Sequence, residues 1–415
     1  MRAGDGPSAV VEGLQGAAMG EVVAFAQGAL GVVASLERSV VRVTVLDESR
    51  APCPGEAARA TGCPLEIVGG DGSLGRVVDA LGRPLDGGLP IEGPRHPLRL
   101  APRPLTALAP AGPLLSTGVR QIDLLAPLLR AQATGVVAPA LGGKTCLAVD
   151  IAAAHDDPEA RCVYVCPGLD RAAAVHAKLR ASGVLARAVV VSAPAGSNAL
   201  KRLSPRGGAA LADAFRGAGR RVLLVWDEVH EDDDASLVTE HAGAWGGAGV
   251  VSVLALARTP RLLAAQVDHL LVFEGHTFLL DFEAVWKGDR YRRRMADWKW
   301  LIGILLRERE LRELVRSVGE GQIDEGSRAA LARWRTLVRD VLTQPPHTPE
   351  PIERTLTRAL CAVQCLPCDA TTLDALARSH APLLAAIREQ GRLSVPHRRA
   401  LDEALRPRGL PSMKR

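Results

Sequence analysis

The chain contains the stretch Thr134-Gly-Val-Val-Ala-Pro-Ala-Leu-Gly-Gly-Lys-Thr-Cys-Leu-Ala-Val149, in which a short apolar run leads into a loop of small residues and a helix-prone segment. A buried strand, a glycine-rich loop and a helix opening with lysine and threonine form the phosphate-binding P-loop arrangement. There, loop N–H groups and the positive helix end hold phosphate oxygens, the lysine adds a point charge, and the threonine hydroxyl can ligate Mg²⁺. The stretch therefore predicts a nucleotide site at Ala138, Pro139, Ala140, Leu141, Gly142, Gly143, Lys144 and Thr145.

The loop departs from the usual P-loop pattern at its first positions. Ala138 stands where that pattern has glycine, and Pro139 follows it. Alanine disfavours a positive φ, and proline supplies no N–H donor. A glycine-rich turn with a solvated lysine is therefore the alternative interpretation, although Gly143, Lys144 and Thr145 stand where phosphate binding needs them.

The composition indicates a chain of two or three domains. With 415 residues, 47% of them hydrophobic and only 3% aromatic, the chain must build its core from leucine, valine and alanine. The net charge of +5 is a mild excess without a basic tail, which is too weak to indicate nucleic-acid binding. No apolar run approaches the roughly 18 residues that a membrane-spanning helix requires.

Eight cysteines are scattered along the chain, and the N-terminus shows no secretory signal. This combination favours free thiols in a reducing compartment over a disulfide framework. Cys361, Cys365 and Cys368 lie close together, but no fourth ligand follows nearby and they fall at the end of an apolar helical run. We interpret them as structural thiols, with a metal site as the alternative.

Three regions with different patterns follow one another. Residues 1–68 contain short β-branched runs separated by glycine-rich breaks, which predicts a small β-barrel domain, with a sandwich as the alternative. Residues 69–294 contain a proline-rich linker, 90–113, and then alternating strands and helices, which indicates a mostly parallel α/β domain. Residues 295–415 are rich in arginine, leucine and alanine at helical spacing and predict a helical bundle domain.

The individual elements can be predicted as well. In the first region, strand-like runs cover 22–25, 31–35, 39–46 and 65–68. In the α/β domain, strands are expected at 135–138, 162–166, 188–192, 222–226, 250–256 and 270–273, and helices at 144–155, 171–181, 208–215 and 262–267. Right-handed crossovers place the strand ends along one edge of such a sheet, so ligands are expected there.

One of these strands ends in Trp226-Asp-Glu228, where two acids follow an apolar run. In a P-loop fold this strand end lies beside the phosphate loop, and its aspartate holds Mg²⁺ through water. We therefore predict a Mg²⁺ site formed by Thr145 and Asp227, with Asp227 acting through water. The alternative is a strand that simply exits to solvent, because the acidic run 231–234 follows.

Basic and aromatic residues stand together in Tyr291-Arg-Arg-Arg294 and Trp298-Lys-Trp300. Such residues could bind a nucleic acid by stacking and charge. We favour a domain junction here and expect no nucleic-acid partner.

Barrel, P-loop domain and helical domain, in that order, resemble one subunit of a hexameric rotary ATPase, and in particular the alpha subunit of F-type ATP synthases. The motifs that carry the resemblance span nearly the whole chain: 74–88, Thr117-Gly118, Ile122-Asp123, Gly143-Lys-Thr145, 189–193, 203–205, Asp227, Lys287-Gly288 and 379–394. The resemblance implies a RecA-like central domain that binds ATP or ADP with Mg²⁺.

The chain departs from this family at residues that matter for catalysis. Ala138 and Leu141 replace the glycine and glutamine of the family's loop. Leu169, in Gly168-Leu-Asp-Arg171, stands where the homologous catalytic subunit has the glutamate that orients the attacking water. Leucine cannot do that work, so the resemblance implies no catalytic residue in this chain.

A third departure concerns the segments that meet neighbouring subunits in the family. A short stretch, 231–245, replaces a long helix and an interface segment. The family's interface arginine falls at Leu301, so Lys299 or an arginine from 290–294 would have to substitute for it, the lysine without forked geometry. The family's N-terminal stalk-contacting segment is also expected to be missing, because the barrel begins almost at Met1.

The resemblance implies a non-catalytic, regulatory nucleotide-binding subunit of a rotary, proton-translocating ATP synthase. The complex would couple ATP synthesis or hydrolysis to ion transport. The implied partners are beta-type catalytic subunits, a gamma-type central stalk and the other synthase subunits. The implied location is peripheral, on the cytoplasmic face of a membrane such as the bacterial inner membrane.

Two other readings remain open. The chain could be a decayed structural paralogue that scaffolds a ring without binding nucleotide, as Ala138, Pro139 and Leu169 suggest. It could also be an independent hexameric motor, such as a secretion ATPase or a helicase. The motor needs a catalytic glutamate and an arginine finger, so Leu169 argues against it.

Overall fold

The computed structural model describes residues 8–46, 51–98, 113–154, 157–166, 168–230, 233, 239–245, 249–274, 279–280, 310–311, 313–345, 347–363 and 369–390. The chain divides into two compact units. Unit 1 comprises residues 1–110, 131–136 and 156–267, and unit 2 comprises residues 111–130, 137–155 and 268–415.

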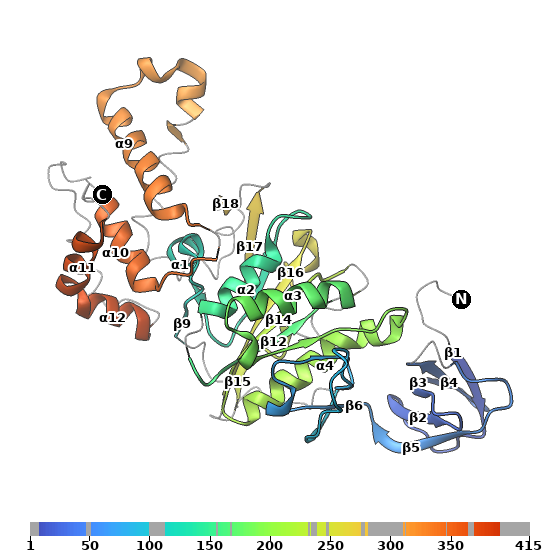
Figure 1. Ribbon diagram of the computed structural model, residues 1–415. Coiled ribbons are helices and arrows are strands. Elements are labelled where there is room, and N and C mark those ends of the chain that lie inside the picture. The colour runs from blue at the N-terminus through green and yellow to red at the C-terminus, as the bar shows by residue number, and fades with distance from the viewer. Residues whose placement is uncertain are drawn as a thin grey trace. The chain divides into compact units, whose positions relative to one another are not determined.

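Unit 1 begins with a five-stranded antiparallel sheet, coloured blue in Figure 1. Its strands are β1 (Ser8–Glu12), β2 (Glu21–Phe25), β3 (Leu30–Leu36), β4 (Val40–Val45) and β5 (Ala58–Pro64), in the order β1-β4-β3-β2-β5. Buried and half-buried residues alternate along β2, because successive side chains of a strand point to opposite faces of the sheet. The apolar face packs around Phe25 and forms a core of its own.

The all-β prediction for this region is confirmed, although two strands were missed. The runs predicted at 22–25, 31–35 and 39–46 correspond to β2, β3 and β4, and the run at 65–68 contains β6 (Glu66–Val68), which pairs with β8 (Arg95–Pro97). β5 escaped the prediction because its sequence, ARATGCP, contains a glycine and a proline, which strand interiors disfavour. Closure of the sheet into a barrel stays a prediction, as do the three domain boundaries.

The rest of unit 1 is built on a mostly parallel sheet, which confirms the predicted α/β domain. β12 (Ala160–Val165) pairs in parallel with β13 (Ala188–Val191) and β14 (Arg221–Trp226), and β14 pairs in parallel with β16 (Gly249–Ala257). β11 (Ala133–Val137) adjoins β16, β7 (Val77–Val78) adjoins β13, and β15 (Gly243–Trp245) pairs antiparallel with β16. β13 is buried throughout, which is typical of a parallel strand covered on both faces.

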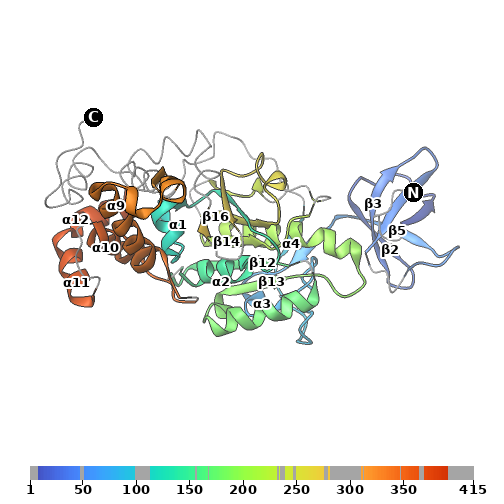
Figure 2. The same cartoon turned by 90° about the horizontal axis from the view of Figure 1, so that it is seen from above.

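Two long helices pack against this sheet, α3 (Leu169–Ala181) and α4 (Asn198–Gly217), as Figure 2 shows from above. α4 is much longer than the predicted helix at 208–215. Its N-cap is Ser197, whose hydroxyl oxygen accepts the Leu200 N–H, and the helix continues through Pro205, where one helical hydrogen bond is lost. A Cβ at Gly208 would lie 2.3 Å from Cγ2 of Val165, so this glycine lets the helix approach β12 closely.

The helix predicted at 262–267 is wrong. A 3₁₀ turn, Pro260–Leu262, and further turns fill this segment before β17. The proline fixes the start of the turn, and six residues are too few to sustain an α-helix without strong packing. Two more 3₁₀ turns in unit 1 are Asp71–Ser73 and Leu185–Arg187.

Unit 2 contains the helix that follows the P-loop and the C-terminal helices. Its elements are β9 (Leu114–Leu115), α1 (Arg120–Leu125), β10 (Leu128–Leu129), α2 (Lys144–Ala154), β17 (His269–Glu274), β18 (Leu279–Leu280), a 3₁₀ turn (Glu320–Gln322), α9 (Glu325–Thr336), a π-helical segment (Leu337–Leu342), α10 (Ile352–Val363), α11 (Ala370–Ser379) and α12 (Ala381–Gln390). α10 packs against α11, α12 and α1, so the described C-terminal segments are helical, as the sequence pattern predicted. Their assembly into a separate bundle domain stays a prediction.

Some predicted features lie outside the described residues: the basic and aromatic residues at 291–300, the substitutes proposed for the interface arginine, Leu301, and two of the three clustered cysteines. Of that cysteine cluster, Cys361 is described and is buried in α10. Among the helices that the structure describes, none has the length and apolar character needed to cross a bilayer.

Asp123 gives unit 2 a pH-dependent stability. Its carboxylate is fully buried and accepts hydrogen bonds from the Thr117 N–H (2.8 Å), the Thr117 hydroxyl (2.7 Å) and the Gly118 N–H (3.1 Å). Burial raises the pKa of Asp123 from 3.8 to about 7, and these hydrogen bonds offset only part of that rise. Because the folded pKa is the higher one, the contribution of Asp123 to stability is fully present below the unfolded pKa and is lost as the pH rises to the folded pKa.

We expect the unfolding free energy of the wild type, relative to Asp123→Asn, to fall between pH 3.8 and about 7 and to stay level above that. Urea denaturation at a series of pH values measures both proteins. Their difference isolates Asp123, because all other titrating groups are shared. A difference that stays flat over this range would contradict the assignment.

Candidate functional site

The predicted phosphate loop lies in unit 2 and curls around its own lysine. The loop leaves β11 after Val137 and enters α2 at Lys144. The Lys144 side chain is buried, and its Nζ donates to the carbonyl oxygens of Ala138 (2.6 Å) and Pro139 (2.9 Å). The Gly142 N–H donates to the same Pro139 carbonyl (3.1 Å). The first residues of the loop therefore serve as acceptors that hold the lysine in place.

The middle of the loop is conformationally strained. Leu141 has φ of 61°, and Gly143 has φ of 80°. The left-handed region suits glycine but costs an L-residue such as leucine about 1 kcal/mol or more. The Leu141 side chain is 98% exposed, so no packing within the described residues offsets this cost. The strain is therefore a property of the loop's shape, as is common where a backbone is held ready for a ligand.

The residues at the end of the loop fit a phosphate group. Backbone N–H groups of the first turn of α2 are the donors that an anion meets at a helix N-terminus. A Cβ at Gly142 would lie 3.0 Å from the Pro139 oxygen and 3.1 Å from Cβ of Ala138, so the tight turn of the loop leaves little room for a side chain at this position. A phosphate oxygen is also a stronger acceptor for Lys144 than a neutral carbonyl. Ala138 and Pro139 fit less well, since proline adds no donor.

The predicted metal-shell acid, Asp227, follows β14 in unit 1 and is completely buried. Its backbone N–H donates to the Val165 carbonyl (2.8 Å) of the neighbouring strand. Its Oδ1 accepts from Nη2 of Arg171 (3.0 Å), and its Oδ2 accepts from Nε of Arg171 (3.1 Å) and from the Tyr164 hydroxyl (3.0 Å). Asp227 is thus held by a forked guanidinium contact, the strongest geometry for such a pair.

The next residue, Glu228, is held in the same way. It has φ of 72°, and its carboxylate accepts from Nη1 of Arg171 (2.8 Å) and from Nη2 of Arg258. Burial alone would raise the pKa of Glu228, but the hydrogen bond from Arg258 and the charge of Arg171 hold it below its usual value. We call Tyr164, Arg171, Asp227, Glu228 and Arg258 the acid–arginine cluster.

Burial alone would lower the pKa of Arg171, but the charge of Asp227 and its hydrogen bond raise it. The pKa of Tyr164 lies well above its ordinary value, first because of burial and then because of the Asp227 charge. Arg171 and Tyr164 therefore stay protonated at neutral pH and keep donating to Asp227. The cluster therefore holds charge in place, and the pKa shifts of Arg171, Tyr164 and Glu228 all favour the protonation states that keep these contacts.

The sequence interpretation located Asp227 but missed the residues that bind it. Tyr164 lies within the predicted strand 162–166, and Arg171 lies in the motif Gly168-Leu-Asp-Arg171. No local signal identified them as its partners, because the pairing of β12 with β14, which brings them to Asp227, is set by the packing of the whole sheet. Leu169, at the start of α3, is 37% exposed and has no group that could orient water.

The predicted loop and the predicted acid thus belong to different units, with residues 137–155 in unit 2 and Asp227 in unit 1. That Thr145 and Asp227 share one Mg²⁺ ion stays a prediction. Both have interactions with protein groups in the described structure.

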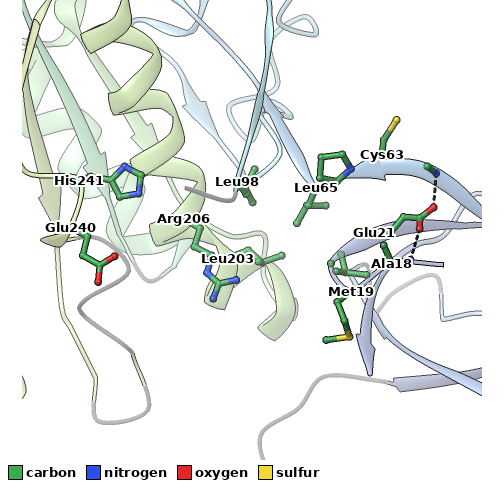
Figure 3. A pocket seen from close by; sticks show the side chains of 14 residues that line it. Ala18, Met19, Glu21, Cys63, Leu65, Leu98, Leu203, Arg206, Glu240 and His241 are labelled. Atoms are coloured by element: carbon green, nitrogen blue, oxygen red, sulfur yellow. Dashed lines mark hydrogen bonds between the residues drawn. The ribbon is translucent and has the colours of Figure 1, made fainter. Parts of the chain in front are cut away.

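Unit 1 also contains a cavity of about 620 Å³ next to α4, shown in Figure 3. Its wall combines apolar side chains, among them Met19, Leu65 and Leu203, with the polar groups of Arg206 and Glu240. None of the residues predicted to bind nucleotide lines this cavity, so it is not the predicted nucleotide site.

Comparison with known proteins relates part of the chain to one family. Residues 118–236 match the model of the ATP synthase alpha/beta family, nucleotide-binding domain. The chain is 35% identical over 233 residues to ATP synthase subunit alpha of Caldanaerobacter subterraneus subsp. tengcongensis, covering 55% of this chain and 46% of the relative. It is 35% identical over 224 residues to ATP synthase subunit alpha 1 of Methylococcus capsulatus, covering 53% and 44%.

A third relative is ATP synthase subunit alpha of Limosilactobacillus fermentum, 34% identical over 238 residues that cover 56% of this chain and 46% of the relative. The chain therefore spans about half the length of the curated relatives it matches. The segment that matches the family model contains the loop 138–145, Arg171 and Asp227. The resemblance inferred from the sequence is confirmed as a similarity: residues 118–236 match the nucleotide-binding domain of the ATP synthase alpha/beta family, and about half of the chain is similar to ATP synthase alpha subunits.

Proposed function

We propose that this chain is a nucleotide-binding, non-catalytic subunit of alpha type in a rotary ATP synthase or ATPase. The observation that carries the proposal is the loop 138–145, which buries Lys144 against its own carbonyls at the start of α2. Lys144 and the first N–H groups of α2 would hold the phosphates of ATP or ADP, and the Thr145 hydroxyl would ligate Mg²⁺. The metal would neutralise phosphate charge.

The chemistry of the acid–arginine cluster supports a non-catalytic role. Hydrolysis needs a group that orients or deprotonates the attacking water. Leu169 has no such group, and Glu228 is held by two guanidinium groups that keep its pKa low. This subunit would therefore bind nucleotide and regulate, while a beta-type subunit performs the reaction.

The similarity to alpha subunits supports the remaining parts of the proposal. The chain would alternate with beta-type subunits around a gamma-type stalk, bind the membrane only through the other synthase subunits, and help couple ATP synthesis or hydrolysis to proton transport. Its place would be peripheral, on the cytoplasmic side of a bacterial inner membrane.

Replacing Lys144 by alanine is expected to weaken nucleotide binding by about 10-fold or more, because a charge-assisted hydrogen bond to phosphate is worth roughly 1.5–3 kcal/mol. Titration of the purified chain with a fluorescent ATP analogue and Mg²⁺ measures the dissociation constant. Lys201→Ala is a matched control, because Lys201 is an exposed lysine on α4. Equal affinity of the wild type and Lys144→Ala would refute the site.

A scaffold that no longer binds nucleotide is the second candidate. It is favoured by Ala138, Pro139 and the strained Leu141, which depart from an efficient cradle. A wild-type chain that binds no ATP analogue, yet co-purifies with a beta-type subunit, would establish this candidate. An independent motor would instead show ATPase activity in the isolated chain.

A further inference from the structure

We propose that Arg171 and Tyr164 prevent Asp227 from supporting a Mg²⁺ ion. Nucleotide binding by this chain then gains no affinity from a metal held at the acidic end of β14. The part of the inference that concerns nucleotide affinity rests on the proposed function. The part that concerns Mg²⁺ binding at Asp227 does not. It assigns Asp227 a different role from the one its position after β14 suggests: the anchor of an internal ion pair.

The Asp227 carboxylate is not accessible to a metal-bound water. An aspartate that supports Mg²⁺ from outside its ligand shell must accept a hydrogen bond from a metal-bound water. Asp227 has no exposed surface, and both of its oxygens accept from the Arg171 fork, with the Tyr164 hydroxyl as an additional donor at Oδ2. In this arrangement no water reaches the carboxylate, so the residues around Asp227 do not fit a metal-bound water.

The charges of the acid–arginine cluster also disfavour a divalent cation. Arg171 binds both acids, and Arg258 binds Glu228 from the other side. Two carboxylates and two guanidinium groups leave the cluster with no net charge. A divalent cation would therefore meet two fixed positive charges beside the two negative ones, and the attraction that normally draws Mg²⁺ to a pair of acids is cancelled.

Moving Arg171 away from Asp227 is also costly, because the backbone on both sides of the contact is fixed. The chain on either side of Asp227 is fixed, since the Asp227 N–H donates to Val165 (2.8 Å) and the Val229 N–H donates to Leu256 (2.8 Å). Arg171 is fixed in the first turn of α3, where the Ala172 N–H donates to Gly168 (2.9 Å). Moving Arg171 away would leave a buried carboxylate without its partner, which is strongly unfavourable.

The test compares the wild type with Arg171→Gln, and with Arg171→Gln combined with Asp227→Asn. The first readout is the melting temperature of the nucleotide-free protein in MgCl₂, against NaCl of equal ionic strength. We expect no specific Mg²⁺ effect in the wild type, an increase of a few degrees in Arg171→Gln because Asp227 loses its guanidinium partner and Glu228 loses one of two, and loss of that increase in the double variant. Arg180→Gln is the matched control, because it removes an exposed arginine from the same helix.

The second readout is the ratio of nucleotide dissociation constants in EDTA and in Mg²⁺. We expect Arg171→Gln to raise this ratio about 10-fold over the wild type, the value of one added charge-assisted hydrogen bond. If Arg171→Gln does not fold, Arg171→Lys replaces it, because an ammonium covers one carboxylate oxygen and uncovers the other. It should then show a Mg²⁺-specific stabilisation that the wild type lacks.

Two results would overturn the inference: a wild type stabilised by Mg²⁺ alone as much as the Arg171 variant, or a folded Arg171 variant with no Mg²⁺ response. A wild type that binds no nucleotide under either condition would refute the proposed function instead. The melting experiment contains no nucleotide and so decides the role of Arg171 in either case.

Discussion

Replacing Gly82 by alanine should destabilise unit 1 by about 3 kcal/mol, one of the largest effects expected for a single methyl group in this chain. Gly82 has φ of 83°, in the region that glycine alone adopts without cost. A Cβ there would lie 2.0 Å from the Val68 carbonyl oxygen and 2.9 Å from the Val68 nitrogen. Backbone atoms cannot rotate away as a side chain can, so the turn or the paired segment must shift.

Gly87 provides a matched control for this substitution. It also has a positive φ, 73°, but a Cβ there would meet nothing within 4 Å. Gly87→Ala therefore measures the conformational cost alone, about 1 kcal/mol. Urea denaturation followed by circular dichroism gives both values. If Gly82→Ala loses no more stability than Gly87→Ala, the close approach of Val68 does not hold in solution.

The second large effect is expected at Glu350, a buried carboxylate in unit 2 that binds several arginines. It accepts from Nε of Arg120 (2.5 Å) on α1 and from Nε of Arg358 (2.8 Å) on α10, and Arg354 lies 3.4 Å away. Glu350→Ala should cost about 3–5 kcal/mol, because removing one partner of a buried ion pair leaves the other charges uncompensated. The link that Glu350 forms between Arg120 on α1 and Arg358 on α10 would be lost.

Hydrogen exchange of peptides from 120–125 and 352–363 measures this opening directly. Both should exchange faster in Glu350→Ala, whereas peptides from α3 in unit 1 should not change. Arg354→Ala is the control, since its side chain is 44% exposed and an exposed ion pair contributes at most about 1 kcal/mol. Equal protection in the wild type and Glu350→Ala would show that the apolar contacts of α10 suffice.

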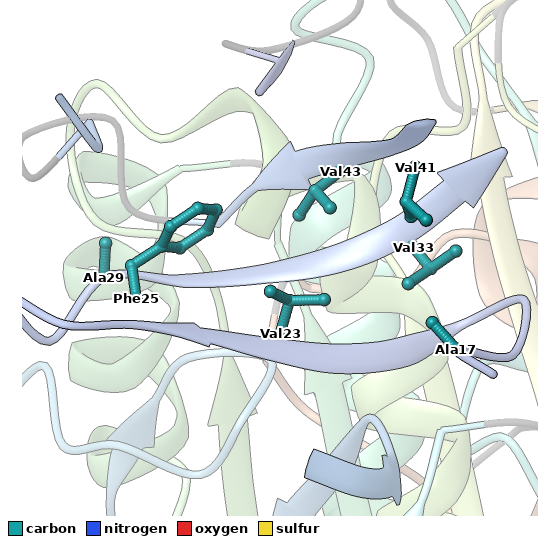
Figure 4. Close-up of a cluster of buried hydrophobic side chains, with 7 residues drawn as sticks. All are labelled: Ala17, Val23, Phe25, Ala29, Val33, Val41 and Val43. Atoms are coloured by element: carbon teal, nitrogen blue, oxygen red, sulfur yellow. The ribbon is translucent and has the colours of Figure 1, made fainter. Parts of the chain in front are cut away.

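Local sequence patterns predicted much of the fold correctly. The N-terminal sheet is an example, because β2, β3 and β4 are short valine-rich runs separated by breaks. Buried apolar residues on these strands and beside them form the core seen in Figure 4: Ala17, Val23, Phe25, Ala29, Val33, Val41 and Val43. The parallel strands β12, β13 and β14 were also predictable, since each is a short apolar run after a helical segment. α4 was underestimated because a proline and two adjacent glycines interrupt its helical pattern.

Part of the candidate site could be predicted from local sequence, and part of it could not. The loop 138–145 could be found from the sequence, because its residues are neighbours in the chain and their order encodes the turn, the lysine and the start of α2. The strained conformation of Leu141 could not be found, since the φ of a leucine in a loop depends on how both ends of the loop are fixed. The presence of Leu141 where the family has glutamine did not reveal its positive φ.

The sequence by itself determined that an acid follows the strand ending at 226 and that a glycine-rich loop leads into a helix opening with lysine and threonine, because such features depend on residues close together in the chain. Only the tertiary structure decided what Asp227 binds. Arg171 and Tyr164 are 56 and 63 residues away from it, and they reach it because β12 and β14 are neighbours in the sheet. Strand order is set by packing over the whole sheet, so no local pattern could reveal that the acid already has a cation.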